Sequence, residues 1–405
     1  MAEEVWMLQT KKADFKQIGA RFRIDPVTAR IIRNRGIEGE AAIDRYLNGT
    51  LDDLYDPMLL KDMERAVSIL CEAVDTGKKI RIVGDYDIDG VCSTYILLQA
   101  FERLGSDVDF EIPDRIKDGY GINESIIEQA HADGVEVILT CDNGISAFHQ
   151  VELAKKYGMT VVITDHHEVP LDGEKEKIPP ADAVIDPKQA DCPYPFPEIC
   201  GAVVAYKLVQ VLYARRGVPR MEWLDLLEFA AIATVGDVMK LQDENRILVK
   251  YGLKKMAQTK NLGLRRLAEK NNLDLGAITA YHIGFVIGPC LNAGGRLKTA
   301  KEALALLRAQ SEEEAERLAE ELKELNDTRK DMTEQGTEAA KLQVESWYQK
   351  DKVLVVFLPE CHESLAGIIA GRLREYYQKP AIVLTRGEEA VKGSGRSIDE
   401  YLSLI

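Results

Sequence analysis

The sequence has few of the features that mark membrane, secreted or zinc-binding proteins. No apolar stretch approaches the roughly 20 residues that a membrane-spanning helix needs. The first residues, Met1 to Glu4, lack the basic segment and following apolar run of a secretion signal, so we expect none. The seven cysteines are scattered without a C-x-x-C pair, which argues against a zinc site or a disulfide framework. These absences favour a cytoplasmic protein with reduced thiols and no membrane contact.

An excess of positive charge is also missing. Lys and Arg total 52 against 67 Asp and Glu, which gives a formal net charge of −15 at pH 7. Such an acidic balance argues against a nucleic-acid coat or a membrane-surface protein, although it leaves room for a local basic groove. Hydrophobic residues at 46% and charged residues at 29% are typical of a globular protein. A chain of 405 residues is long enough for two or three domains.

The hydrophobic pattern divides the chain into five segments. From Met63 to about Lys240, apolar strands alternate with helices, which predicts an α/β domain with a mainly parallel sheet. Glu312–Gln349 is rich in charged residues with an apolar stripe, which predicts a long connecting helix or, alternatively, the arm of a coiled-coil dimer. The predicted segments are a helical start (1–60), a catalytic α/β domain (61–245), a helical region (246–310), the connecting helix (311–349) and a smaller α/β domain (350–405).

Acids and histidines follow three of the predicted strands. The strands are Lys79–Val83, Val135–Leu139 and Met159–Ile163, and their Val and Ile content indicates burial in a parallel sheet. Ligands of open α/β sheets bind outside the carboxyl ends of the strands. The candidates at these ends, with one more after the apolar helix Leu224–Thr234, are Asp85, Asp87, Asp89, Asp142, Asp165, His166, His167 and Asp237. Oxygen and imidazole ligands suit Mn²⁺ or Mg²⁺, so the pattern predicts a metal-dependent enzyme that acts on phosphate.

The triplet Asp85, Asp87 and Asp89 places three carboxylates within five residues. They repel one another unless a cation neutralises them, and Gly90 lets the backbone turn into a helix whose N-terminus favours negative charge. A calcium loop of the EF-hand type is the alternative, but it requires a Glu at its twelfth position and a helix on both sides. An apolar strand precedes the triplet instead, which favours the metal-enzyme interpretation.

The remaining candidates predict a metal site more strongly together than each does alone. Asp142 alone could be a turn residue that caps the next helix, and Asp237 alone could be a helix cap. Asp165-His166-His167 is more specific, because one histidine can bind a metal while its neighbour faces substrate and Asp165 orients a ring. With Asp237 as a further carboxylate, the set predicts a site for two cations that act on a phosphoryl group.

Three arginines beside glycines point to anion binding. Arg115 lies in a glycine-containing loop, Arg296 closes a predicted glycine-rich turn that begins at Ala293, and Arg396 lies in the predicted loop Gly393–Ser397. Backbone N–H groups of the last loop could form a nest that holds a phosphate beside the guanidinium, although each segment could equally be an ordinary turn. The candidate substrate-binding residues are Arg115, Arg296, His362, Arg372, Ser394 and Arg396.

The acidic triplet, Asp142, the Asp-His-His motif and Asp237 together resemble the DHH phosphoesterase superfamily. Further motifs, spread over nearly the whole chain, are similar to the RecJ family of single-strand-specific 5′-to-3′ DNA exonucleases. They are Arg35-Gly36, Asp56-Pro57, Ile287-Gly288-Pro289, Arg296-Leu297, Leu325-Asn326 with Arg329, Gly367-Ile368, Gly371-Arg372 and Gly393-Ser394-Gly395-Arg396-Ser397. The resemblance implies a DHH catalytic domain joined by a long helix to a smaller DHH-associated domain.

The family resemblance also implies which residues bind metal. One cation would be bound by Asp87 and Asp142. The other would be bound by Asp89, Asp142, His166 and Asp237, with Asp142 bridging the two. The cofactors implied are two ions of Mn²⁺ or Mg²⁺, which would activate the water that attacks the phosphodiester.

The remaining roles follow from the same resemblance. Asp85 and Asp165 would support the ligands, while His167 would contact the scissile phosphate or assist the leaving group. The six substrate-binding candidates would hold phosphates in a cleft between the domains that admits a single strand and excludes a duplex by its width. The implied reaction is hydrolysis of single-stranded DNA to mononucleotides from the 5′ end.

Two departures from the family pattern matter. Val83 stands where many members place a histidine before the triplet, so one metal would have one protein ligand fewer. The chain also stops at Ile405, whereas family members usually continue to a Gly-Gly-His segment and the exonucleases add an OB-fold DNA-binding domain. We therefore expect the smaller domain to be incomplete, the OB-fold to be absent and DNA affinity to be the property most at risk.

Three functions are compatible with these patterns. The first is an exonuclease of DNA repair and recombination, with single-stranded DNA, single-strand binding protein and a RecQ-type helicase as its expected partners. The second is a small-substrate phosphodiesterase of the same superfamily that acts on short oligonucleotides or cyclic dinucleotides. The third is a non-catalytic replisome or repair scaffold, which would be expected to lose acids from the metal site. Because the acids are present and the RecJ-like motifs are numerous, the sequence favours the exonuclease.

Overall fold

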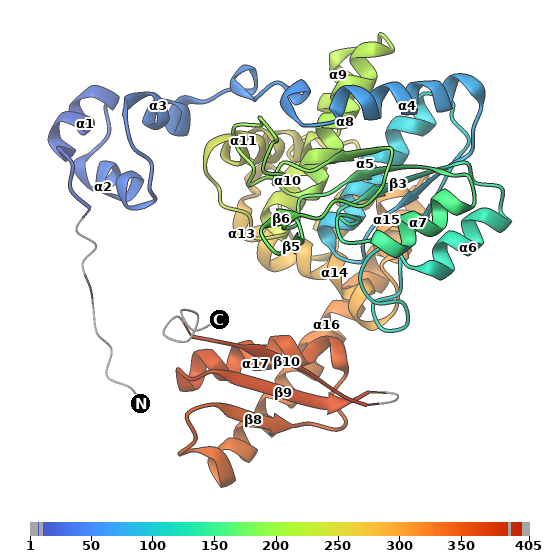
Figure 1. The fold of residues 1–405 in the computed structure, drawn as a ribbon. Coiled ribbons are helices and arrows are strands. Elements are labelled where there is room, and N and C mark those ends of the chain that lie inside the picture. The colour runs from blue at the N-terminus through green and yellow to red at the C-terminus, as the bar shows by residue number, and fades with distance from the viewer. Residues whose placement is uncertain (1–6, 8–10, 388–389, 399–405) are drawn as a thin grey trace.

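The computed structural model describes Met7, residues 11–387 and residues 390–398. Three short helices at the start form a cluster around Ile32, Ile37 and Ile43, and Figure 1 shows them to one side of the larger α/β body. Arg45 ties this cluster to the body, because its Nε donates to Asp243 Oδ1 at 2.8 Å. The elements of this segment are α1 (Phe15–Phe22), α2 (Pro26–Asn34), α3 (Glu40–Asn48), η1 (Leu51–Asp53) and η2 (Pro57–Leu59).

A five-stranded parallel sheet forms the centre of the larger domain and confirms the predicted fold class. The strand order is β2-β1-β3-β4-β7, and the register pairs Ile82 with Leu139 and Leu139 with Val162. Val and Ile dominate β1 and β3 because these strands are buried on both faces. The strands are β1 (Ile80–Val83), β2 (Val108–Glu111), β3 (Val137–Cys141), β4 (Thr160–Thr164) and β7 (Ala183–Ile185).

Helices cover both faces of this sheet. Side chains that point one way, such as Ile82 and Leu139, join the main core with α4, α5 and α8. Side chains that point the other way, such as Ile138 and Ile163, pack under α6 and α7. These helices are α4 (Met63–Thr76), α5 (Ile88–Arg103), α6 (Glu124–Ala132), α7 (Phe148–Lys156) and α8 (Gly201–Arg215). A short hairpin of β5 (Leu171–Asp172) and β6 (Lys175–Glu176) follows β4. The two helical layers hold the carboxyl ends of the strands along one edge.

A helical region follows the sheet domain. The apolar helix α10 carries buried residues along almost its whole length, because it packs between α5, α8 and α11. The helices here are α9 (Arg220–Leu224), α10 (Leu227–Gly236), α11 (Asp243–Met256), α12 (Leu262–Lys270), α13 (Ala280–His282), α14 (Gly288–Leu297) and α15 (Lys301–Arg308), with the single turns η3 (Leu275–Ala277) and η4 (Ile283–Ile287). The turn η4 is a π-helix that runs directly into α14.

The glycine-rich turn predicted at residues 293–296 is wrong, because these residues are helical and belong to α14. Their glycines serve close packing instead of a turn. A Cβ added to Gly294 would lie 2.7 Å from the carbonyl oxygen of Thr299, and one added to Gly295 would lie 2.3 Å from the carbonyl oxygen of Tyr86. Glycine therefore lets α14 approach the loop that carries the acidic triplet.

One long helix connects the two domains. Helix α16 (Glu312–Gln343) has 32 residues and continues into the π-helical turn η5 (Val344–Tyr348). Its apolar stripe, including Leu318 and Leu322, is buried in the core of the larger domain. The stripe is therefore used within the chain, and the coiled-coil alternative fails on this point.

The smaller domain has a three-stranded sheet backed by one helix. Its strand order is β10-β9-β8, with β8 and β9 parallel and β10 antiparallel to β9. The loop predicted at Gly393–Ser397, with its phosphate-holding nest, is wrong, because residues up to Arg396 pair with β9 as an extended edge strand. The glycines again allow close approach, since a Cβ on Gly393 would lie 2.5 Å from Leu384 Cδ2. The elements are β8 (Leu354–Phe357), α17 (Glu363–Tyr377), β9 (Ala381–Arg386) and β10 (Val391–Arg396).

Two expectations concern the whole chain. Within residues 11–387 and 390–398, no helix combines the length and apolar character that crossing a bilayer requires. All seven cysteines are free thiols, and five of them are buried.

Candidate metal centre

The predicted acids and histidines converge at the carboxyl ends of β1, β3 and β4. These strands are neighbours in the sheet and run parallel, so the residues that follow them meet at one edge. Three groups of candidate ligands have atoms within 4.8 Å of one another. The groups are Asp85, Asp87 and Asp142; Asp89, His166 and Asp237; and Asp142, His166 and His167. Asp142 and His166 each belong to two groups, so the three groups form one continuous cluster.

Helix N-termini hold two acids of the triplet. Asp87 caps α5, where its Oδ1 accepts the backbone N–H groups of Asp89 at 2.9 Å and Gly90 at 3.1 Å. Asp89 lies in the first turn of α5 and accepts the N–H groups of Gly201 and Ala202 at the start of α8, both at 2.7 Å. The positive ends of two helices thus favour charge on these carboxylates. The sequence indicates the N-terminus of the helix that follows the triplet, but not the contact with the N-terminus of α8.

Asp142 occupies an unusual backbone position at the end of β3. Its φ is 61°, in the left-handed region, and its N–H donates to the carbonyl of Thr164 at 3.0 Å. Asp tolerates this conformation better than most residues, yet it remains uncommon and is often found at functional sites. The conformation directs the carboxylate into the cluster, where Oδ1 is buried without a hydrogen-bond partner.

His166 lies among three carboxylates. Its Nε2 is 3.0 Å from Asp142 Oδ1, 3.4 Å from Asp89 Oδ2 and 3.9 Å from Asp237 Oδ2. Asp237 reaches this point from the C-terminal cap of α10. The imidazole nitrogen thus has three carboxylate oxygens within 3.9 Å, and imidazole and carboxylate are ligands that divalent cations accept.

Buried polar atoms without partners show that the cluster fits a cation. Asp85 Oδ2, Asp142 Oδ1 and His166 Nδ1 are buried and make no hydrogen bond. Buried polar atoms are normally paired, and an unmet need in several neighbouring groups indicates a bound ion. The donor set therefore fits one or two oxygen-seeking divalent metals.

The raised pKa values of the acids also indicate a site for a cation. Burial and the Asp87 carboxylate raise the pKa of Asp85 to about 7. Burial and the Asp89 carboxylate raise the pKa of Asp237 to about 7, and the pKa of Asp142 is also raised by burial and its acidic neighbours. Burial lowers the pKa of His166, which keeps its ring neutral and able to bind a metal. The positive charge carried by the residues of the cluster is smaller than the negative charge of its carboxylates.

His167, a member of the third group, pairs with Asp165. Its Nδ1 lies 2.7 Å from Asp165 Oδ1, and Asp165 also accepts the N–H of Ile145 at 2.8 Å and of His166 at 2.7 Å. Burial opposes charge on His167, but the hydrogen bond and charge of Asp165 outweigh it and raise the pKa of His167 to about 9. His167 is therefore a cation at neutral pH, with Asp165 fixing its orientation.

Two residues of this region escaped the sequence patterns. Tyr120 donates its hydroxyl proton to the carbonyl of Asp142 at 2.7 Å and lies 3.1 Å from His167 Nδ1. Asp186 follows β7 as the other acids follow their strands, and it is buried with Oδ2 unpartnered. Burial and Asp165 raise its pKa to about 7. Asp186 could have been predicted, because it follows a strand as the other acids do. Nothing in the sequence indicates that Tyr120 contacts Asp142.

A cavity between the domains collects four of the six substrate-binding candidates. It has a volume of about 320 Å³, and its wall includes Arg115, Arg296, Ser394 and Arg396. Burial, with repulsion from Arg115 and then Arg329, lowers the pKa of Arg296 to about 10. Crowded guanidinium groups of this kind favour a bound anion.

The other two candidates lie elsewhere. The ring of His362 bonds to Ser364, with Nδ1 2.8 Å from Oγ, and it borders a different hollow beside α16. Arg372 is exposed on α17 and is close enough to Arg329 to lower the pKa of that residue, after burial. Neither lies on the wall of the interdomain cavity. Ser364 does join the domains, because its Oγ donates to the carbonyl of Arg296 at 3.0 Å.

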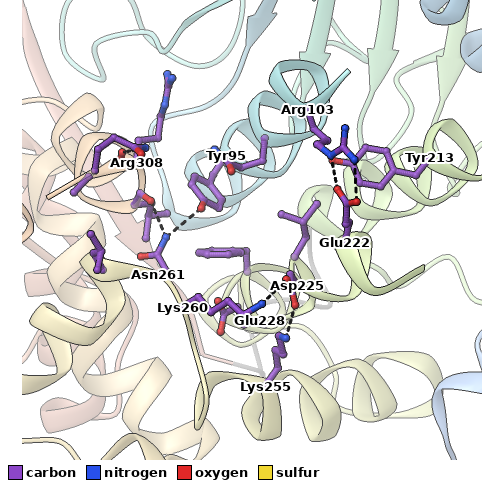
Figure 2. Close-up of a pocket in the computed structure, with 17 residues that line it drawn as sticks. Tyr95, Arg103, Tyr213, Glu222, Asp225, Glu228, Lys255, Lys260, Asn261 and Arg308 are labelled. Carbon is purple, nitrogen blue, oxygen red and sulfur yellow. Dashed lines mark hydrogen bonds and ion pairs between the residues drawn. The ribbon is translucent and has the colours of Figure 1, made fainter. Parts of the chain in front are cut away.

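A larger cavity of about 440 Å³ lies at the other end of α5, away from the acidic cluster (Figure 2). Its charged side chains pair with one another: Arg103 bonds to Glu222 at 3.0 Å, and Lys260 to Asp225 at 3.4 Å. Burial raises the pKa of Glu228 there to about 7. None of the ligand groups found among the described residues includes a residue of this wall. Size alone therefore does not make this cavity the site.

A family model with the description "DHH family, N-terminal domain" matches residues 79–234. This match contains every candidate of the cluster except Asp237. The single-stranded-DNA-specific exonuclease RecJ of Bacillus subtilis is 37% identical to the chain over 396 residues. That alignment covers 97% of this chain and 49% of the relative, so the chain spans about half the length of that protein.

Two solved structures are similar in three dimensions. The crystal structure of RecJ from Thermus thermophilus in complex with Mn²⁺ has a TM-score of 0.79 and 31% identity, covering 95% of this chain and 53% of that one. A crystal structure of exonuclease RecJ bound to manganese has a TM-score of 0.73 and 33% identity, covering 84% of this chain and 83% of that one. The similarity extends through both domains and the connecting helix of the chain.

Substitution of Gly201 should disturb the cluster without removing a ligand. A Cβ at this position would lie 2.7 Å from Asp142 Cβ, so Gly201→Ala must displace the aspartate. We expect Mn²⁺ to bind on the order of tenfold more weakly, as titration calorimetry would show. Gly371→Ala on α17 is the matched control, because an added Cβ there meets nothing within 4 Å. Equal Mn²⁺ affinity in both variants would show that the position of Asp142 is not critical.

The raised pKa values predict how pH and metal act on stability. Asp85 and Asp237 titrate near 7 in the metal-free fold, above their ordinary value of 3.8. The folded protein then holds more protons than the unfolded chain between about pH 4 and 7, so its free energy of unfolding falls as pH rises through this range. A cation replaces these protons.

Thermal unfolding in EDTA or Mn²⁺ measures this effect. The increase in Tm caused by Mn²⁺ should be larger at about pH 8 than at about pH 5.5, because protons compete with the metal at low pH. An increase of the same size at both pH values would contradict the assignment of these acids to the metal centre.

Proposed function

Because the chain belongs to the RecJ family of DHH exonucleases, we propose that it hydrolyses single-stranded DNA to mononucleotides from the 5′ end with two divalent cations, Mn²⁺ or Mg²⁺. The observation that carries this proposal is the cluster of buried carboxylates at the strand ends, whose unpartnered oxygens need a cation. The arginine-lined cavity beside it supplies a place for the phosphates of the strand.

The proposed ligand sets are those that the family resemblance implies. One cation would be held by Asp87 and Asp142, which belong to one group of neighbouring side chains. The other would be held by Asp89, His166 and Asp237, which form a second group, together with Asp142, which shares a group with His166. Asp85 supports the first set, because it falls within 4.8 Å of Asp87 and Asp142 in the same group. When bound, the two cations lower the pKa of water and neutralise the charge that develops on the phosphate.

The proposed role of His167 is proton transfer to the leaving group. Hydrolysis adds the oxygen of water to phosphorus and breaks the P–O3′ bond, so the 3′ oxygen of the departing nucleotide must gain a proton. His167 carries a proton at neutral pH, because Asp165 holds its pKa at about 9. Tyr120 contacts the same ring, with its hydroxyl 3.2 Å from Nε2.

The proposed strand-holding residues are the arginines and the serine of the interdomain cavity. Arg115 stands over the ring of Tyr86 at 4.8 Å, which fixes its guanidinium beside the acidic triplet. Arg296 comes from the larger domain, whereas Ser394 and Arg396 come from β10 of the smaller domain. A phosphate between them would relieve the mutual repulsion of these guanidinium groups. We assign His362 and Arg372 to more distant parts of the strand.

The wider setting is part of the same proposal. We propose that the enzyme acts in DNA repair and recombination in the cytoplasm. Single-strand binding protein and a RecQ-type helicase are proposed partners, since one coats its substrate and the other produces it.

Digestion of end-labelled DNA tests the function. The purified chain should release mononucleotides from the 5′ end of a long single strand in Mn²⁺ or Mg²⁺ and none in EDTA, with a blunt duplex resistant. Asp142→Asn is the matched control and should be inactive, because it weakens a carboxylate shared by both cations. Cleavage of a dinucleotide but not of the long strand would favour the small-substrate alternative. No metal-dependent cleavage of either substrate would refute the proposal.

A further inference from the structure

Tyr120 joins two parts of the metal centre through one hydroxyl group. It lies in the loop between β2 and α6. The hydroxyl donates its proton to the carbonyl of Asp142 at 2.7 Å, and the same oxygen lies 3.2 Å from His167 Nε2. Asp142 follows β3 and His167 follows β4, so the hydroxyl spans the ends of two neighbouring strands. It therefore contacts both the proposed shared ligand and the proposed proton donor.

His167 needs a second restraint to keep its orientation. Its Nδ1 lies 2.7 Å from Asp165 Oδ1, and this bond fixes one nitrogen of the ring. A ring held at one nitrogen can still turn about that bond, which would move Nε2. The contact of Nε2 with Tyr120 opposes this rotation. Proton transfer depends on such orientation, because a displacement of about 1 Å can reduce a rate about 100-fold.

The carbonyl of Asp142 is a rigid anchor for this hydroxyl. The N–H of the same residue donates to the carbonyl of Thr164 at 3.0 Å, which ties its backbone to β4. Its side chain is almost fully buried among the other acids. Because the sheet holds this residue in place, Tyr120 is fixed relative to the strand ends, and through Tyr120 the ring of His167 is fixed as well.

The loop that carries Tyr120 is fastened to the same site. The N–H of Gly121 donates to Asp85 Oδ1 at 3.3 Å. Gly121 has a φ of 68°, and a Cβ there would lie 3.1 Å from Asn143 Cβ, so glycine lets the loop lie against the end of β3. The ring of Tyr120 then stands edge-on to His167, with centroids 5.4 Å apart and planes at 72°.

Packing in the core does not account for this arrangement. Tyr120 is 48% exposed, so its ring adds little to the buried apolar surface of the fold. Its hydroxyl proton is already used by the carbonyl of Asp142, so it is not the proton that a leaving group receives. The contacts instead fit a residue that orients a neighbour.

We propose that Tyr120 is a positioning residue, whose hydroxyl, anchored on the carbonyl of Asp142, holds the ring of His167 so that Nε2 faces the departing 3′ oxygen. This inference rests on the proposed function and adds a residue to the same site. Hydrolysis adds the oxygen of water to phosphorus and breaks the P–O3′ bond, while the proton moves from His167 Nε2 to the 3′ oxygen. Tyr120 orients this acid and gives up no proton itself.

A strand with a better leaving group tests this role. Tyr120→Phe removes only the hydroxyl, and the rate constant for release of the first nucleotide, measured with enzyme in excess, should fall about tenfold. This loss is part of the roughly 100- to 10,000-fold that a general acid supplies. The comparison strand carries sulfur in place of O3′ at its first linkage. Its P–S bond breaks to a thiolate that needs no proton, so wild type and variant should cleave it equally fast. An equal loss on both strands would overturn the role.

A second variant tests whether Tyr120 acts through His167. His167→Ala already lacks the acid, so Tyr120→Phe/His167→Ala should be no slower than His167→Ala alone. A further tenfold loss (about 1.4 kcal/mol) in the double variant would overturn the inference. Tyr157→Phe is the matched control and should cleave as wild type, because Tyr157 stacks on His131 before β4 begins, whereas His167 follows the end of that strand. Failure of the wild-type chain to cut either strand would instead refute the proposed function.

Discussion

Repulsion among buried carboxylates is the constraint on which the rest of the structure depends. Asp85, Asp87, Asp89 and Asp142 meet at one edge of the sheet, and Asp85, Asp89 and Asp142 are almost fully buried. The fold offers only partial compensation. Two helix N-termini donate to Asp87 and Asp89, but burial and mutual repulsion still raise the pKa values of Asp85, Asp87 and Asp142. Such a centre is stable in its charged form only with cations.

The arginines of the interdomain cavity lie close to the acidic cluster but outside it. Arg115 and Arg296 stand on the side that faces the smaller domain, and Arg396 faces them from β10. If these arginines lay inside the acidic cluster, they would neutralise it and leave no need for a metal. The separation leaves a negative centre beside a positive wall. In the proposed function, cations bind the first and phosphates bind the second, so a net charge of −15 is compatible with DNA as the substrate.

Much of this could be predicted from the sequence, because strand ends are easy to recognise. The runs before Asp85, Asp142 and Asp165 are rich in Val and Ile, and parallel strands bring their ends together. The glycine segments were harder. Gly294 and Gly393 were predicted to lie in turns or loops, but one lies in a helix and the other in a strand, where they allow close contact with Thr299 and Leu384. Local composition cannot distinguish a glycine needed for a turn from one needed for contact with a distant segment.

The sequence also does not show which distant residue a side chain will contact. For this reason, the contact of Tyr120 with Asp142 and the location of His362 were not predicted. The number of cations that the cluster holds can be measured by titrating metal-free protein with Mn²⁺ at about pH 8. We expect two ions per chain, and we expect Asp142→Asn to lose high-affinity binding of both, because the residue is proposed as a ligand of each. A single site in the wild type, or two intact sites in the variant, would contradict this expectation.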